Sequence, residues 1–221
     1  MSESNKRNFI VHGSILAIAG ILVRIIGMLY RIPVVNIIGS EGNGIYGAAF
    51  NIYNIMLVLS SYGLPMAVSK LVSARFTKRR YKSAAKVLRC SLMVAVCTGG
   101  IAALLVFFGA SFIENVIYGG GLPGLAIPLR ILAPTIFLVA ILGVIRGFFQ
   151  GQSTMIPTAV SQILEQIVNA IVSIAAGYGM MKAFASSPDV AAYGAAGSTL
   201  GTAMGALTAG FFMGFFFLGY K

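Results

Sequence analysis

The sequence contains six long apolar stretches, separated by short segments rich in charged residues, glycine and proline. Each stretch reaches the roughly 20 residues that an α-helix needs to cross the hydrocarbon core of a membrane. Only 10% of the residues are charged, whereas soluble domains average about 25%. We therefore expect an all-α integral membrane protein, a bundle of six transmembrane helices. The stretches fall at residues 9–38, 45–74, 87–113, 125–149, 157–184 and 194–220.

Basic residues cluster between the second and third apolar stretches, in residues 75–89. This segment holds Arg75, Lys78, Arg79, Arg80, Lys82, Lys86 and Arg89. Cytoplasmic loops of membrane proteins are enriched in Lys and Arg. If the polar leader 1–8 is cytoplasmic, eleven basic residues fall on the inner side and only Lys182 on the outer side. We therefore predict a multi-pass protein of the cytoplasmic (inner) membrane with a cytoplasmic amino terminus and a basic cytoplasmic loop 75–89.

Several classes of function lack the residues that they require. The net charge of +11 does not indicate a nucleic-acid-binding protein, because the basic residues lie at the ends of apolar stretches. The single histidine, His12, leaves no His-containing catalytic set and no zinc motif, and no nucleotide-binding glycine loop is present. Cys90 and Cys97 would lie about 10 Å apart along a helix, beyond the reach of a disulfide. We expect no enzymatic activity, no metal, no cofactor and no nucleic-acid partner.

Two arginines in the first stretch are the strongest candidates for a binding site. Arg24 lies about 22 Å into its span, where a charge costs several kcal/mol unless it faces a wet cavity or a partner. Arg31 follows seven residues later and therefore shares its face of the helix. Two guanidinium groups on one face favour an anionic ligand, and their planar forks suit phosphate. Alternatively, Arg31 anchors the helix at the outer headgroups, just before a bend expected at Pro33.

The second stretch combines polar side chains with an interrupted helix. Asn51, Asn54 and Lys70 fall at loosely helical spacing, and Gly63 and Pro65 interrupt the hydrogen-bond ladder between them. A broken helix at membrane depth requires protein or a water-filled cavity around its freed backbone groups. Lys70 therefore either faces a polar lumen or continues the basic loop.

A polar stripe marks the fifth stretch. Glu165 lies about 12 Å beyond Pro157, where a carboxylate should be paired with a cation or protonated. A structural ion pair and a proton-coupling role both remain open, with Arg24, Lys70 and Arg146 as candidate partners. Arg130 and Arg146 lie near the ends of the fourth span, where their side chains are expected to snorkel. The stripe consists of Gln162, Glu165, Gln166, Asn169 and Ser173.

Small residues recur at helical spacing on the first and sixth stretches. Such faces let neighbouring backbones approach closely in membrane helices. We expect these positions to serve ordinary helix packing rather than to contact a ligand. They are Gly13, Gly20 and Gly27 on the first stretch, and Gly201, Gly205 and Ala209 on the sixth.

Four segments together resemble a known family. They are RIIGMLYRIP at 24–33, GSEGNGIYG at 39–47, SSYGLPMAVSK at 60–70 and RGFFQGQSTMIP at 146–157. The chain resembles the polysaccharide biosynthesis proteins related to stage V sporulation protein B and, more distantly, the lipid II flippases of the MurJ type. These belong to the multidrug/oligosaccharidyl-lipid/polysaccharide (MOP) exporter superfamily, whose members pair two six-helix lobes around a central cavity.

The resemblance implies a function in lipid-linked sugar transport. It identifies the chain with an amino-terminal lobe of a flippase that moves a polyprenyl-pyrophosphate-linked oligosaccharide by alternating access. Arg24 matches an arginine of the family's cationic cavity, and Arg31 lies one residue from a second. The expected partners are this anionic lipid, membrane lipids and a missing carboxy-terminal lobe or a second copy of the chain.

Two alternatives remain at this point. A cation-coupled multidrug exporter of the same architecture would use Glu165 as its coupling acid, although a cationic cavity repels cationic drugs. A non-transporting membrane scaffold would instead bind cell-wall synthesis enzymes through the basic loop, which would serve equally well to hold anionic lipids.

Overall fold

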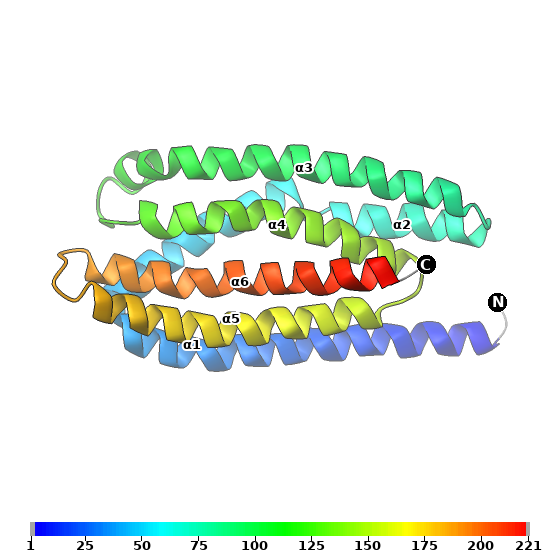
Figure 1. Ribbon diagram of the computed structural model, residues 1–221, viewed down its shortest axis with the longest axis horizontal. Helices are drawn as coiled ribbons and strands as arrows, with labels where there is room; N and C mark the ends of the chain where they lie inside the picture. Colours follow the sequence, from blue (N-terminus) through cyan, green and yellow to red (C-terminus); the bar gives the residue numbers. More distant parts are fainter. Residues whose placement is uncertain (1–2, 220–221) are drawn as a thin grey trace.

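The computed structural model describes residues 3–219, and the side chains of residues 13–219. These residues form helices and no strand (Figure 1), which confirms the all-α prediction. Residues 1–2 of the expected leader, together with Tyr220 and Lys221, lie outside the described part, and residues 3–8 begin the first helix. The elements are α1 (Glu3–Ser60), α2 (Leu64–Thr77), α3 (Tyr81–Phe112), the π-helical turn η1 (Ile113–Ile117), α4 (Ala126–Gly151), α5 (Ile156–Ala183) and α6 (Val190–Gly219).

Five of the described segments are long and apolar enough to cross a membrane, so the predicted count of six is not matched exactly. The first of them, Gly13–Thr77, is 65 residues long, about three times the length that one crossing needs. No loop separates the first two predicted spans, because residues 39–44 are helical except for the backbone of Gly39.

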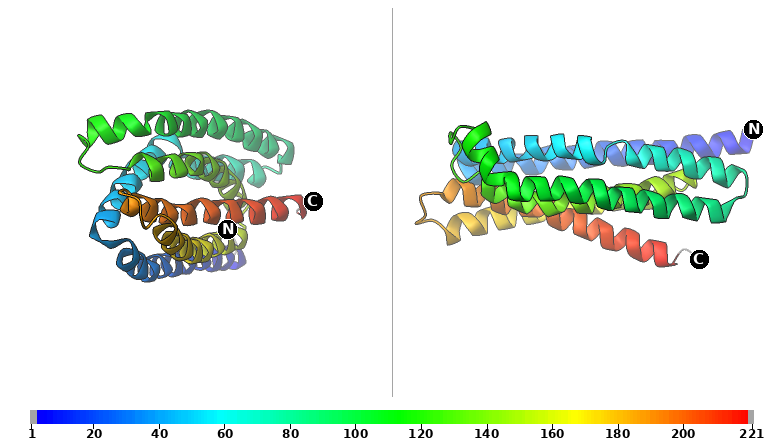
Figure 2. Two further views of the ribbon diagram at one scale, coloured as in Figure 1. Left: turned by 60° about the vertical axis from the view of Figure 1, so that its left-hand side comes forward. Right: turned by 90° about the horizontal axis from the view of Figure 1, so that it is seen from above.

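Gly39 divides α1 into two legs. Its backbone angles, φ 70° and ψ −175°, lie in a region that only glycine adopts without strain. The first leg, residues 3–38, runs along the bundle, and the second leg, residues 40–60, turns back toward the end where the first began (Figures 1 and 2). Pro33 lies within the helix of the first leg, so the change of direction falls six residues beyond the position expected from the sequence.

The predicted interruption of the second span is present. The chain leaves the helix at residues 61–63, and α2 begins at Leu64 with Pro65 in its first turn. Proline is tolerated there because the first amide groups of a helix have no intrahelical acceptor. The α2–α3 turn is only 78–80, so most of the basic segment 75–89 belongs to the ends of two helices.

The elements pack with their connections at two opposite ends. The beginning of α1, the α2–α3 turn and the end of α6 lie at one end of the bundle (Figure 1). At the other end, Glu114 caps α4, since its carboxylate accepts hydrogen bonds from the backbone amides of Gly124 (3.0 Å) and Ala126 (2.7 Å). Cys90 and Cys97 are exposed and form no disulfide.

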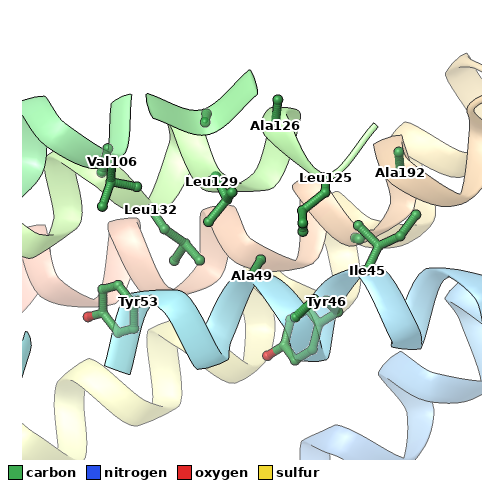
Figure 3. Packing of buried hydrophobic residues seen from close by; sticks show 14 of the residues in the cluster. Ile45, Tyr46, Ala49, Tyr53, Val106, Leu125, Ala126, Leu129, Leu132 and Ala192 are labelled. Carbon is green, nitrogen blue, oxygen red and sulfur yellow. The ribbon is translucent and has the colours of Figure 1, made fainter. Parts of the chain in front are cut away.

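The largest apolar core lies between the second leg, α3, α4 and the beginning of α6. Figure 3 shows Tyr46 and Tyr53 of the second leg beside the leucines of α4, with their hydroxyl groups turned away from those leucines. Polar atoms of the second leg are thereby directed out of the apolar core. The members of this core that Figure 3 labels are Ile45, Tyr46, Ala49, Tyr53, Val106, Leu125, Ala126, Leu129, Leu132 and Ala192.

The small residues of α6 allow it to lie very close to α5, as predicted. A Cβ atom at Gly201 would lie 2.5 Å from the carbonyl oxygen of Asn169, and one at Gly205 would lie 2.6 Å from that of Glu165. Ala209 is fully buried as well, but it packs with Leu142 and Phe149 of α4. The α5–α6 pair therefore forms a closely packed part of the bundle.

The glycines of the first leg behave differently. Only Gly27 meets another helix, since a Cβ atom there would lie 3.0 Å from Nε2 of Gln166. Nothing lies within 4 Å of the corresponding position at Gly13 or Gly20, so close packing at these two residues is a wrong prediction for the described chain. The pattern of small residues indicates a permissive face but does not show which helix, if any, covers it.

Candidate functional site

An ion pair joins α4 to α5 in the interior of the bundle. Nη2 of Arg146 lies 2.7 Å from Oε2 of Glu165, and the two side chains are only 13% and 23% exposed. Nε of Arg146 donates to Oγ of Ser161 at 3.0 Å, and that hydroxyl donates to the carbonyl of Thr158. Of the three cations considered as partners for Glu165, the structure selects Arg146. Snorkelling of Arg146 is therefore a wrong prediction, because its guanidinium is directed inward.

Asn169, one turn further along α5, connects three helices. Its Nδ2 lies 3.4 Å from the hydroxyl of Tyr30 on the first leg, and its Oδ1 accepts a hydrogen bond from Ser173 at 2.9 Å. Thr202 of α6 lies at the distance limit of a hydrogen bond, 3.5 Å from the same oxygen. The predicted stripe of α5 thus faces the first leg and α6 rather than lipid.

Two buried tyrosines of the second leg extend this polar region. Tyr46 and Tyr53, two turns apart, are only 5% and 6% exposed, and their hydroxyl groups point away from the leucines of α4 (Figure 3). Their spacing gave no signal in the sequence, since buried aromatic residues at helical spacing are typical of an apolar core.

The remaining predicted site residues lie on the surface of the described chain. All five are exposed, and none of their side chains forms an ion pair or a hydrogen bond with another described residue. The predicted site is therefore divided: the stripe of α5 is internal, whereas these side chains face outward. They are Arg24, Arg31, Asn51, Asn54 and Lys70.

Two adjoining cavities follow the interruption between α1 and α2. One has a volume of about 270 Å³ and the other about 460 Å³, and Tyr62, Pro65 and Gln150 line both. We call the combined space the helix-break groove. The first cavity is lined by Leu57, Ser61, Tyr62, Pro65, Val139, Gly143, Arg146, Gln150 and Gln162. The second is lined by Tyr62, Pro65, Met66, Ser69, Lys70, Ser73, Gln150, Ser153 and Met155.

Glycines of α4 allow α2 and α4, which both line the groove, to approach each other closely. A Cβ atom at Gly147 would lie 2.5 Å from the carbonyl oxygen of Pro65, and one at Gly151 would lie 2.7 Å from that of Ser69. Because α2 and α4 meet backbone to backbone here, the position of Arg146 relative to the interruption is rigidly defined.

The family follows from comparison with known sequences. A sequence model of the family described as "Polysaccharide biosynthesis protein" matches residues 10–220. The chain belongs to this family. Its members and their relatives are integral membrane transport proteins, so the apolar helices of this chain are those of a multi-pass membrane protein.

Three proteins of Bacillus subtilis (strain 168) are similar in sequence to this member of the polysaccharide biosynthesis family. The lipid II flippase MurJ is 34% identical over 176 residues, covering 77% of this chain and 32% of the relative. Stage V sporulation protein B is 32% identical over 164 residues (74% and 31%), and the uncharacterized membrane protein YabM is 30% identical over 208 residues (94% and 38%). The chain spans about a third of the length of these relatives.

A solved structure has the same fold. It is a MOP superfamily transporter from Pyrococcus furiosus, whose description reports a binding pocket of reversed polarity and suggests a different function. The superposition has a TM-score of 0.72 at 17% sequence identity and covers 92% of this chain and 44% of the transporter. The described helices therefore have the architecture of part of a MOP transporter.

Proposed function

We propose that this chain is the amino-terminal lobe of a flippase that moves a polyprenyl-pyrophosphate-linked oligosaccharide across the cytoplasmic membrane by alternating access. Membership of the polysaccharide biosynthesis family and similarity to a lipid II flippase support the general class. The second half of the cavity comes from a carboxy-terminal lobe or from a second copy of the chain. Peptidoglycan and polysaccharide precursors share the anionic lipid that this proposal requires.

Six membrane crossings are part of the proposal. The first leg makes the first crossing, and the second leg together with α2 makes the second, because the chain reverses at Gly39 and keeps its direction through the interruption. With four further helices, the basic α2–α3 turn and the beginning of α1 lie at the same end (Figure 1). This arrangement agrees with the positive-inside rule if that end is cytoplasmic.

The observation that carries the proposal is the pair of unpaired cations on the first leg. Arg24 and Arg31 are exposed, one heptad apart, and no described carboxylate pairs with either. Their guanidinium groups can each donate two parallel hydrogen bonds to phosphate oxygens. Two such groups about 10 Å apart along a helix suit a pyrophosphate and its first sugar better than a single small anion.

The Arg146–Glu165 ion pair argues against the alternative hypothesis of a cation-coupled multidrug exporter. A coupling acid has to exchange protons or cations, whereas Glu165 is held at 2.7 Å by Arg146. In addition, the charged side chains that the structure describes on the first leg, Arg24 and Arg31, and the exposed Lys70 are all positive. An anionic substrate is therefore electrostatically preferred over a cationic drug.

Native mass spectrometry of the detergent-purified chain tests the proposal. We expect wild-type protein to retain a polyprenyl-pyrophosphate-linked disaccharide and the Arg24→Ala variant to retain at least about tenfold less, because a charge-assisted bidentate contact is lost. Arg130→Ala is the matched control, since Arg130 is an exposed arginine of α4 that contacts Ser111 instead. Equal retention by wild type and Arg24→Ala would assign Arg24 to helix anchoring and remove the basis of the proposal.

A further inference from the structure

The guanidinium of Arg146 has hydrogen-bonding capacity that the ion pair does not use. An arginine carries five N–H groups. Nε donates to Ser161 and one Nη2 hydrogen faces Glu165, while Nη1 has no partner among the described residues. The same side chain lines the helix-break groove. Arg146 is thus held from behind by α5 and has N–H donors left for a ligand in the groove.

The charged side chains that line the helix-break groove are both basic, and one of them, Arg146, is paired with Glu165 of α5. Arg146 lines the first cavity and Lys70 the second, and no aspartate or glutamate among the described residues lines either. Neutral donors also line the groove: Gln150 lines both cavities and Gln162 of α5 lines the first. Cations together with amide and hydroxyl donors in one groove form a typical setting for phosphate oxygens.

Apart from four serines, the rest of the lining is apolar and reaches the outer surface. Tyr62 and Met66, at the rim, are 76% and 73% exposed, and Leu57 and Val139 line the deeper part. A strongly hydrated free anion would gain nothing from these side chains, whereas a hydrocarbon attached to a phosphate would bury apolar surface against them. The lining therefore favours an amphiphile over a free inorganic anion.

From this arrangement we infer that the helix-break groove is a second anion subsite, which binds the phosphate of a phosphate-bearing amphiphile through Arg146 and Lys70. It is separate from Arg24 and Arg31, which lie on the first leg, and its ligand class rests on the proposed function. Glu165 competes with the ligand for Arg146, because both are anions that need the same guanidinium. Binding at this subsite therefore loosens the contact between α4 and α5.

Calorimetric titration of the purified chain tests this inference with three probes: farnesyl pyrophosphate, farnesol and inorganic pyrophosphate. We expect farnesyl pyrophosphate to bind more tightly than either of the others. Lys70→Gln and Arg146→Lys should each weaken its binding about tenfold, since each loses a charge-assisted contact. Glu165→Gln should strengthen it about threefold, because the competing anion is gone. Arg130→Gln, outside the groove, should bind like wild type.

This experiment tests the groove subsite and the role of Arg24 in the proposed function independently of each other. If Lys70→Gln, Arg146→Lys and Glu165→Gln all bind farnesyl pyrophosphate like wild type while Arg24→Gln binds it weakly, the groove is not a subsite and the cationic first leg stands. If the groove variants weaken binding and Arg24→Gln does not, the subsite stands and the role of Arg24 is wrong. Equal affinity for inorganic pyrophosphate and farnesyl pyrophosphate would overturn the assignment to an amphiphile.

Discussion

The Gly201→Leu variant is expected not to accumulate as folded protein. Even a Cβ atom at this position would lie 2.5 Å from the carbonyl oxygen of Asn169 and 2.7 Å from the amide nitrogen of Ser173, and both are backbone atoms that cannot rotate away. Overpacking against side chains typically costs 1–3 kcal/mol, and we expect more than about 3 kcal/mol here because α5 and α6 must separate. The yield of monodisperse protein and its unfolding in increasing SDS measure the effect.

Gly214→Leu on the same helix is the matched control. Nothing lies within 4 Å of a Cβ atom at Gly214, and leucine has a higher helix propensity than glycine. Its unfolding midpoint should equal or exceed that of wild type. A Gly201→Leu protein as stable as the Gly214→Leu control would mean that α5 and α6 are not packed backbone to backbone.

The second large effect is expected from Arg146→Met. This substitution leaves the Glu165 carboxylate, 23% exposed, without its cation. Removing one partner of a buried pair typically costs 3–5 kcal/mol, and we expect about 3 kcal/mol because the groove admits some water. The free energy of unfolding in SDS, relative to wild type, provides the measurement.

A double variant separates the lost pair from a lost packing contact. Arg146→Met with Glu165→Met replaces both charges by apolar groups, so most of the lost stability should return. Arg130→Met removes an exposed arginine of the same helix and should change the unfolding free energy by less than about 0.5 kcal/mol. If the double variant were as unstable as Arg146→Met alone, the cost would come from packing and the pair would have no electrostatic role.

Hydropathy predicted six apolar stretches, and the structure departs from this prediction at the boundary between the first two, which form one continuous segment. Residues 39–44 contain Gly39, Gly42 and Gly44 with three polar residues, a composition typical of a loop. In the structure α6 approaches so closely that a Cβ atom at Gly42 would lie 3.2 Å from the carbonyl of Ala191. Gly42 therefore serves close helix packing, whereas Gly39 provides the backbone conformation of the reversal. Tertiary contact overrides a weak local preference for a turn at the other residues of this segment.

The polar residues of the candidate site could be predicted from the sequence, but the contacts that they make with one another could not. Burial cost alone indicates that Glu165 is either protonated or paired with a cation, and Arg24, Lys70 and Arg146 are equally suitable partners in the sequence. The choice depends on the rotation of each helix about its axis, which is set by side-chain packing between helices. Gly147 shows this, since its close contact with Pro65 fixes the face of α4 that carries Arg146.

A flippase lobe with a cationic cavity requires the arginine face of the first leg to border water within the membrane. Single cysteines in a Cys90→Ser, Cys97→Ser background, reacted in native membranes with a hydrophilic, membrane-impermeant thiol reagent, test it directly. Arg24→Cys and Arg31→Cys share one face, and Leu22→Cys and Leu29→Cys are matched controls at similar depth on another face. We expect fast labelling at the two arginine positions and little at the two leucine positions. Equally slow labelling at all four positions would contradict it, because the arginine face would then border lipid.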